Sequence, residues 1–210
     1  CEVTAIQLPG RGSRMQEPPA TSIPQLVEEL MPVVLARRDL PFAFFGHSMG
    51  ASISFELARR LRREGAPGPL HLFVSGRSAP QLDRNYPSLH ALPRAELLEE
   101  LKRLNGTPRE VLEHAELMEL LLPILRADFS ICDTYKHAEE PPLNCPITVF
   151  GGLEDSFIPR PRLEAWRVQT AAAFTLRMLP GDHFFLHSQK SLLLRLLAAE
   201  LQRLAAGLHG

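Results

Sequence analysis

Cysteine is scarce in this sequence, and its spacing fits neither a disulfide framework nor a metal site. The 210 residues contain three cysteines, Cys1, Cys132 and Cys145, which leave an odd count and form no Cys-x-x-Cys pair. The pattern excludes a disulfide scaffold and a structural zinc site, and it favours a reducing cytoplasm. A cysteine nucleophile at Cys132 or Cys145 is an alternative, but neither lies in a sharp strand-to-helix turn, and buried thiols are commoner than reactive ones.

Long apolar runs and an excess of charge of one sign are also missing. No run approaches the roughly 18 apolar residues that a membrane span requires, and no charged-then-apolar leader stands at the start. The formal net charge is −1, so we expect neither nucleic acid nor an anionic membrane as a partner. With 45% hydrophobic and 22% charged residues and no repeat or linker, residues 1–210 are interpreted as a single globular domain.

The sequence does contain an alternation of strand-like and helix-like segments. This alternation is typical of an α/β fold with a mostly parallel, doubly wound sheet flanked by helices. The predicted strands are 3–8, 40–45, 70–75, 146–150 and 174–179; the predicted helices are 23–37, 49–64, 93–104, a segment from 107 and 188–206. The Gly-Arg-Gly stretch at 10–12 lacks the further glycine or lysine of a phosphate loop and is interpreted as a turn.

The motif at residues 46–50, Gly-His-Ser-Met-Gly, is the most informative part of the chain. It lies between a short aromatic strand and a helix, which is the context of a nucleophile elbow. We expect the turn to be so tight that a Cβ would clash at Gly46 and Gly50, while Ser48 is strained with its Oγ exposed. Ser48 is therefore the candidate nucleophile. His47 is expected to pack beside the site.

A nucleophilic serine needs a base and a carboxylate that orients the base. In folds with this elbow the chain order is serine, acid, histidine, each at the end of a later strand. His183 follows the predicted strand 174–179 and is the candidate base, with His187 as its competitor. These strand ends would meet at one crevice of a parallel sheet.

Three carboxylates compete for the orienting role: Glu154, Asp155 and Asp182. Asp182 adjoins His183, and neighbouring side chains in a turn usually point apart, so we interpret it as a turn former. We favour Asp155 over Glu154 because a short side chain is easier to hold rigidly after a strand. The choice between Glu154 and Asp155 stays open at this point.

The stretch between Gly76 and Cys145 interrupts the alternation with helices. A capping box at 107–110 predicts a helix start, and Pro123 is expected to break or kink the apolar run that follows. We interpret residues 77–140 as a lid over the site, which would favour a substrate with a hydrophobic acyl part. The alternative is that these helices merely complete the core. The candidate substrate-facing residues are Met118, Leu121, Leu122 and Leu125.

Three segments together resemble the type II thioesterases of the α/β-hydrolase fold: Leu-Pro-Gly-Arg-Gly-Ser-Arg at 8–14, Phe-Phe-Gly-His-Ser-Met-Gly-Ala at 44–51, and Gly-Asp-His-Phe-Phe-Leu at 181–186. These editing hydrolases accompany polyketide synthases and nonribosomal peptide synthetases in antibiotic biosynthesis, and they are similar to the medium-chain thioesterases of fatty acid synthesis. The resemblance covers essentially the whole chain.

The resemblance implies that Ser48 is the nucleophile, Asp155 the orienting acid and His183 the base. It also implies hydrolysis of acyl groups from the phosphopantetheine arm of an acyl or peptidyl carrier protein. The N–H of Met49, the residue after the nucleophile, would form part of the oxyanion hole, and no metal or cofactor is needed.

One departure concerns the start of the chain. Relatives usually begin earlier, with a strand and a glycine-rich turn that provides a second oxyanion-hole amide. We therefore expect the amino-terminal strand of the family to be missing here, with the second donor before residue 1.

Two other functions remain open. A carboxylesterase or lipase acting on oxygen esters would carry the same elbow. A non-catalytic module that binds a carrier protein is an alternative of another class. The sequence does not indicate the acyl chain, the synthase served or the oligomeric state.

Overall fold

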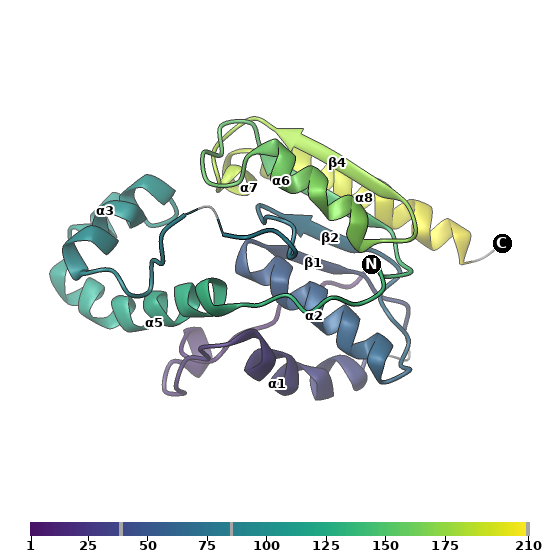
Figure 1. The fold of residues 1–210 in the computed structure, drawn as a ribbon, viewed down its shortest axis with the longest axis horizontal. Helices are drawn as coiled ribbons and strands as arrows, with labels where there is room; N and C mark the ends of the chain where they lie inside the picture. The colour runs from purple at the N-terminus through teal and green to yellow at the C-terminus, as the bar shows by residue number, and fades with distance from the viewer. Residues whose placement is uncertain (38–39, 85, 209–210) are drawn as a thin grey trace.

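The fold is built on a parallel four-stranded sheet (Figure 1). The computed structural model describes residues 1–37, 40–84 and 86–208. The strands lie side by side in chain order: β1 (Phe44–His47), β2 (Leu72–Ser75), β3 (Ile147–Gly152) and β4 (Phe174–Leu179). Parallel pairing requires a crossover between neighbouring strands, and the crossover from β1 to β2 is helix α2 (Met49–Arg63).

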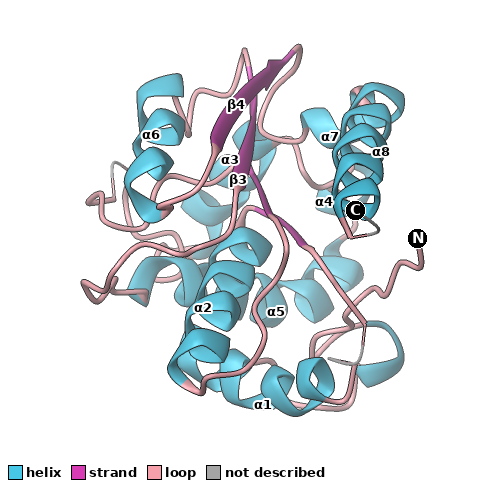
Figure 2. Ribbon diagram, turned by 90° about the vertical axis from the view of Figure 1, so that its right-hand side faces the viewer, coloured by secondary structure: helices cyan, strands magenta, loops and turns pink. Residues whose placement is uncertain are grey.

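Helices cover both faces of the sheet, as Figure 2 shows edge-on. On one face, Phe55 of α2 and Trp166 pack against alternate strand residues such as Val74 and Val149. On the other face, helix α8 (Lys190–Gly207) packs against Phe73 and Phe150. Because both faces are covered, every residue of β2 and β3 is buried, rather than every second one.

The predicted strand at residues 3–8 is wrong. These residues form no strand in the structure, and most of their side chains are exposed. The edge of β1 that faces away from β2 has no strand partner among the described residues. An apolar sequence becomes a strand only where a neighbouring strand accepts and donates its backbone hydrogen bonds, so residues 3–8 stay irregular.

Most other predicted elements are present with shifted ends. Helix α1 (Ile23–Leu35) begins at the predicted residue, with Ser22 as its N-cap. Helix α3 (Arg94–Leu104) and strand β4 match their predicted ranges closely. The crossover between β3 and β4 was not predicted. It contains α6 (Arg160–Glu164) and a 3₁₀ turn (Ala165–Gln169), whose Trp166 is fully buried and donates from Nε1 to Arg77 O at 2.7 Å.

The helical insertion between β2 and β3 has a hydrophobic cluster of its own. It contains α3, the short α4 (Arg109–Leu112) and α5 (Ala115–Thr134), which extend beyond one end of the sheet (Figure 1). Leu97, Leu101 and Met118 are buried in this cluster, all of whose members come from the insertion itself. This part of the insertion therefore has a core of its own, whereas Ile131 near the end of α5 is buried in the cluster that α1 and α2 form.

The expected break at Pro123 does not occur, since α5 runs through it without interruption. The helix break lies instead at His114, directly before the first residue of α5. His114 is the N-cap of α5, and its Nδ1 accepts from Leu117 N at 3.3 Å. The capping box at Thr107 is wrong as well, because Pro108 takes the N-cap position of α4 without a side-chain hydrogen bond.

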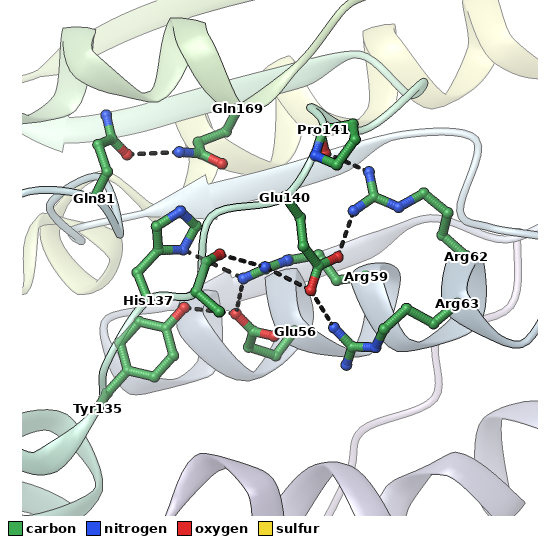
Figure 3. A network of polar contacts seen from close by, with 11 residues as sticks. Glu56, Arg59, Arg62, Arg63, Gln81, Tyr135, His137, Glu140, Pro141 and Gln169 are labelled. Carbon is green, nitrogen blue, oxygen red and sulfur yellow. Dashed lines mark hydrogen bonds and ion pairs between the residues drawn. The ribbon is translucent and has the colours of Figure 1, made fainter.

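A buried arginine of helix α2 binds the segment that leads from α5 back to β3 (Figure 3). Arg59 is 2% exposed. Its guanidinium pairs with Glu56 at 2.6 Å and Glu140 at 2.7 Å and donates to the Ala138 carbonyl. Tyr135, at the end of α5, donates its hydroxyl to Glu56 at 2.6 Å. Arginine suits this position because its planar fork satisfies several acceptors at once.

Replacing Arg59 by methionine is expected to lower stability strongly, because Glu56 loses its cation and the Ala138 carbonyl loses its donor, while Glu140 keeps Arg62 and Arg63. Removing one partner of a buried pair costs about 3 kcal/mol, or roughly 10 °C in Tm for a chain of this size. Arg103→Met is the matched control, since Arg103 also pairs with a glutamate three residues earlier but is exposed. Thermal unfolding of both variants checks this. Equal losses would show that the Arg59 network contributes no more than a surface pair.

Candidate active site

Ser48 occupies the sharp turn between β1 and α2. Its backbone has φ of 51° and ψ of −115°, a conformation that L-residues rarely adopt and that costs energy. Ser48 N donates to Ser75 O at 2.7 Å, so the turn is hydrogen-bonded to the end of β2. Met49 is the first residue of α2, and its N–H is one of the helix-start groups that have no acceptor within the helix.

The two glycines of the elbow have different roles. A Cβ at Gly46 would lie 2.2 Å from Gly50 O and 2.5 Å from Ala51 N, so this position cannot carry a side chain without moving the backbone. At Gly50 a Cβ would meet nothing within 4 Å. The expectation of a clash is right for Gly46 and wrong for Gly50, which is an ordinary position in the first turn of α2.

Asp155 and His183 lie in contact at the ends of β3 and β4. His183 Nδ1 is 2.8 Å from Asp155 Oδ2, and both side chains are buried. The other carboxylate oxygen, Oδ1, accepts from the N–H groups of Phe157 at 2.9 Å and Ile158 at 3.0 Å. The carboxylate is thus fixed by three hydrogen bonds, and it fixes the histidine ring in turn.

These contacts decide the charge state of Asp155. Burial alone would raise the pKa of this carboxyl, but the hydrogen bond from His183, the nearby imidazole and the two backbone donors outweigh it and hold the pKa below its ordinary value. Asp155 is therefore ionised at neutral pH and accepts the Nδ1 proton of His183. In neutral His183 the other ring nitrogen, Nε2, is then unprotonated, and its lone pair can accept a proton.

The competing residues are placed elsewhere. Glu154 is exposed, and so is His187. Asp182 Oδ1 accepts from Phe184 N at 2.8 Å, which is the turn-forming role expected from its sequence position, and its Oδ2 accepts from Asn105 Nδ2 at 2.9 Å. Cys145 is buried in the core, and burial raises its pKa to about 11, so this thiol is poorly suited to act as a nucleophile.

His47 packs beside His183, as expected. The two ring centroids are 5.1 Å apart, and a Cβ on Gly76 would meet Cε1 of both rings, at 2.7 Å and 3.3 Å. Burial, together with the neighbouring His183, lowers the pKa of His47 to about 3, so this ring stays neutral. Its Nδ1 shares a hydrogen bond of 2.9 Å with Ser75 Oγ. The sequence offered no signal for Ser75 or Gly76 beyond their place at the end of β2.

Ser48 and His183 are brought to the same edge of the sheet, but no hydrogen bond joins Ser48 Oγ to His183 in the described part of the chain. In unliganded enzymes such bonds are often long and tighten when substrate binds. The contact between histidine and aspartate is already made in the structure.

The four candidate lid residues differ in placement. Met118 and Leu122 are buried in the cluster of the insertion, and Leu125 packs against that cluster. Leu121 is half-buried. Within residues 1–37, 40–84 and 86–208, no three His, Cys, Asp or Glu side chains are grouped as a metal site, and no helix is long and apolar enough to cross a membrane.

Gly46→Ala is expected to lower both turnover and stability strongly, because its Cβ would collide with backbone and displace Ser48. The overpacking should cost about 3 kcal/mol, and a displacement of the nucleophile by about 1 Å costs roughly 100-fold in rate. Gly50→Ala should fold with equal or higher Tm because alanine is the better helix former. Thermal unfolding and esterase assays on both variants measure this. A Gly46→Ala protein of normal stability and activity would contradict the elbow geometry.

Comparison with known proteins identifies the family. The thioesterase domain model matches residues 1–201. The gramicidin S biosynthesis protein GrsT of Aneurinibacillus migulanus is 48% identical over 205 residues, which cover 98% of this chain and 80% of that protein. The medium-chain S-acyl fatty acid synthase thioesterase of Homo sapiens is 38% identical, over 88% of this chain and 71% of the human protein.

Among solved structures, the type II thioesterase BorB from the borrelidin biosynthetic cluster superposes with a TM-score of 0.85 at 38% identity. The match covers 94% of this chain and 80% of BorB. It confirms the α/β-hydrolase fold that the resemblance to type II thioesterases implied. The chain is a member of the thioesterase family and belongs with the type II thioesterases of polyketide and nonribosomal peptide pathways.

Proposed function

We propose that this protein hydrolyses acyl thioesters carried on the phosphopantetheine arm of an acyl or peptidyl carrier protein. The substrate is a misprimed or stalled acyl group, or a finished chain awaiting release. The single observation that carries the proposal is the pairing of Asp155 with His183 at the edge of the sheet where strained Ser48 lies. The similarity to the thioesterase domain model and to the type II thioesterase BorB supports thioesters as the substrate class.

In the proposed reaction His183 Nε2 takes the proton of Ser48 as Oγ attacks the thioester carbonyl. Asp155 holds the ring and stabilises the imidazolium that forms. The Met49 N–H donates to the oxyanion, near the positive end of the α2 dipole. Collapse breaks the C–S bond, and His183 returns its proton to the leaving thiolate. Water then attacks the acyl-Ser48 ester with His183 again as base, which releases the acid and regenerates Ser48.

His47 supports this chemistry by staying neutral. When His183 becomes an imidazolium, a second positive charge beside it would oppose the step. The low pKa of His47 avoids that charge across the whole working pH range. No metal or cofactor takes part in the scheme.

We further propose that residues 77–140 act as a lid within a single domain spanning 1–210. The separate hydrophobic cluster of the insertion supports a unit that moves as a body. Leu121 is the candidate lid residue that lies outside the hydrophobic cluster of the insertion, so we assign it the contact with an acyl chain. Met118, Leu122 and Leu125 then act on substrate through the shape of the lid that they hold together.

A comparison of two substrates tests the function. The wild-type enzyme should turn over an acyl-S-pantetheine faster than the matching oxygen ester, and a fluorophosphonate probe should label Ser48. Ser48→Ala should lower turnover by roughly 10⁵- to 10⁶-fold and remove labelling while Tm is kept. A preference for the oxygen ester would favour a carboxylesterase. Absence of labelling in the wild type would favour a non-catalytic binding module.

The choice of acid has its own test. Asp155→Asn should lower kcat by about 10³- to 10⁴-fold, because the amide cannot hold the Nδ1-protonated tautomer of His183. Glu154→Gln is the matched control: the neighbouring side chain is exposed and should change kcat less than about twofold. The assignment is wrong if Glu154→Gln is the more damaging substitution.

A further inference from the structure

The turn between α3 and α4 reaches out of the insertion and touches both loops that carry the proposed acid and base. We call residues 103–106 the lid turn. Asn105 Nδ2 donates to Asp182 Oδ2 at 2.9 Å, across 77 positions of sequence. The end of α3 and the start of α7 (Phe185–Ser188), which follows His183, face each other in Figure 1. The turn is therefore a point of contact between the insertion and the site.

Asn105 is suited to this contact by its backbone. Its φ of 56° lies in the left-handed region, which asparagine tolerates better than most residues, and it ends α3 there. The carboxylate that it meets is already engaged on its other side, since Asp182 Oδ1 accepts from Phe184 N. Asp182 thus links the lid turn to the backbone immediately after His183.

Gly106 makes the closest approach. A Cβ on Gly106 would lie 2.2 Å and 2.3 Å from Cε2 and Cζ of Phe184, so the ring of Phe184 rests directly on the glycine. On its other sides the same ring meets His183 edge-on at 5.1 Å and His47 at 5.6 Å. Phe184 therefore lies between the lid turn and the two histidines.

The third contact reaches the acid. The guanidinium of Arg103 lies 5.8 Å from the ring centroid of Phe157. Phe157 N donates to Asp155 Oδ1, one of the three hydrogen bonds that fix the carboxylate. The lid turn thus borders the loops of both members of the Asp155–His183 pair, although no residue of the turn touches either member directly in the contacts described.

We propose that Asn105 and Gly106 are positioning residues: when the lid turn docks on Asp182 and Phe184, it holds the His183 loop in the geometry that accepts the Ser48 proton. The inference rests on the proposed function and adds to it that closure of the lid and alignment of the base are one event. Opening of the lid would then loosen His183, so the base is aligned only while the lid turn is docked.

An exchange of polar groups tests the hydrogen bond. Asn105→Asp places two carboxylates about 3 Å apart and should lower kcat on acyl-S-pantetheine about tenfold at low salt, with a smaller effect on KM. The loss should shrink near 1 M salt, where the Debye length falls to about 3 Å. In Asn105→Asp/Asp182→Asn the amide and carboxylate are exchanged, the bond to Phe184 N is kept, and kcat should recover to within about twofold of wild type.

A glycine pair tests the steric contact. Gly106→Ala should lower kcat and the rate of fluorophosphonate labelling by about tenfold or more, because Phe184 must move against His183. Gly68→Ala is the matched control, since a Cβ on Gly68 meets nothing within 4 Å and its φ is not positive. Both variants should keep a Tm within a few degrees of wild type. If Gly106→Ala does not fold, the Asn105 and Asp182 variants still decide the proposal.

The outcomes separate the two proposals. Unchanged kcat in Asn105→Asp, a defect that salt does not relieve, or no recovery in the double variant would overturn the positioning role. A drop in Tm with normal kcat in Gly106→Ala would overturn it too, because it would mark the contact as structural only. Failure of the wild-type enzyme to hydrolyse acyl-S-pantetheine would instead remove the proposed function on which the inference rests.

Discussion

Ser48 has a backbone conformation that is unfavourable by itself, and the packing of strand against helix maintains it. Gly46 allows this because its bare Cα lies against the backbone of Gly50 and Ala51, where any side chain would push β1 and α2 apart. The hydrogen bond from Ser48 N to Ser75 O then connects the turn to β2. The position of the half-buried serine at the end of the sheet, on the edge that also carries His183, depends on this close approach of two backbone segments.

In the site next to the elbow, burial and hydrogen bonds together determine which side chains are charged. Asp155 is buried yet ionised because three donors face its two oxygens. His47 is half-buried and neutral because desolvation, together with the neighbouring His183, outweighs the attraction of Asp155. Two groups of one site therefore reach opposite charge states, and both states would favour one imidazolium at His183 during acyl transfer. The lid turn extends the same arrangement to the insertion through Asp182 and Phe184.

The sequence alone was sufficient where a local signal coincides with the tertiary requirement. The strained turn at Ser48, the placement of Asp155 and His183 after successive strands, and the strand 174–179 are of this kind. The predictions from sequence were wrong where contacts with other parts of the fold decide the local structure. Residues 3–8 are apolar enough for a strand but have no strand neighbour. Pro123 lies within α5, although its local preference is to break a helix. In the sequence, Asn105 and Gly106 indicate only the end of the predicted helix 93–104. Their contacts with Asp182 and Phe184, in the loop of His183, are visible only in the fold.

The central claim is that Ser48 carries the acyl group between the two half-reactions. Its most direct test is intact-protein mass spectrometry of the enzyme quenched in acid within milliseconds of mixing with an acyl-S-pantetheine. The account predicts a transient mass increase equal to the acyl group minus one hydrogen, located by peptide mapping on Ser48, and absent from a Ser48→Ala sample treated identically. Thioester hydrolysis at full rate with no acylated Ser48 under these conditions, or with the acyl group on another side chain, would contradict it.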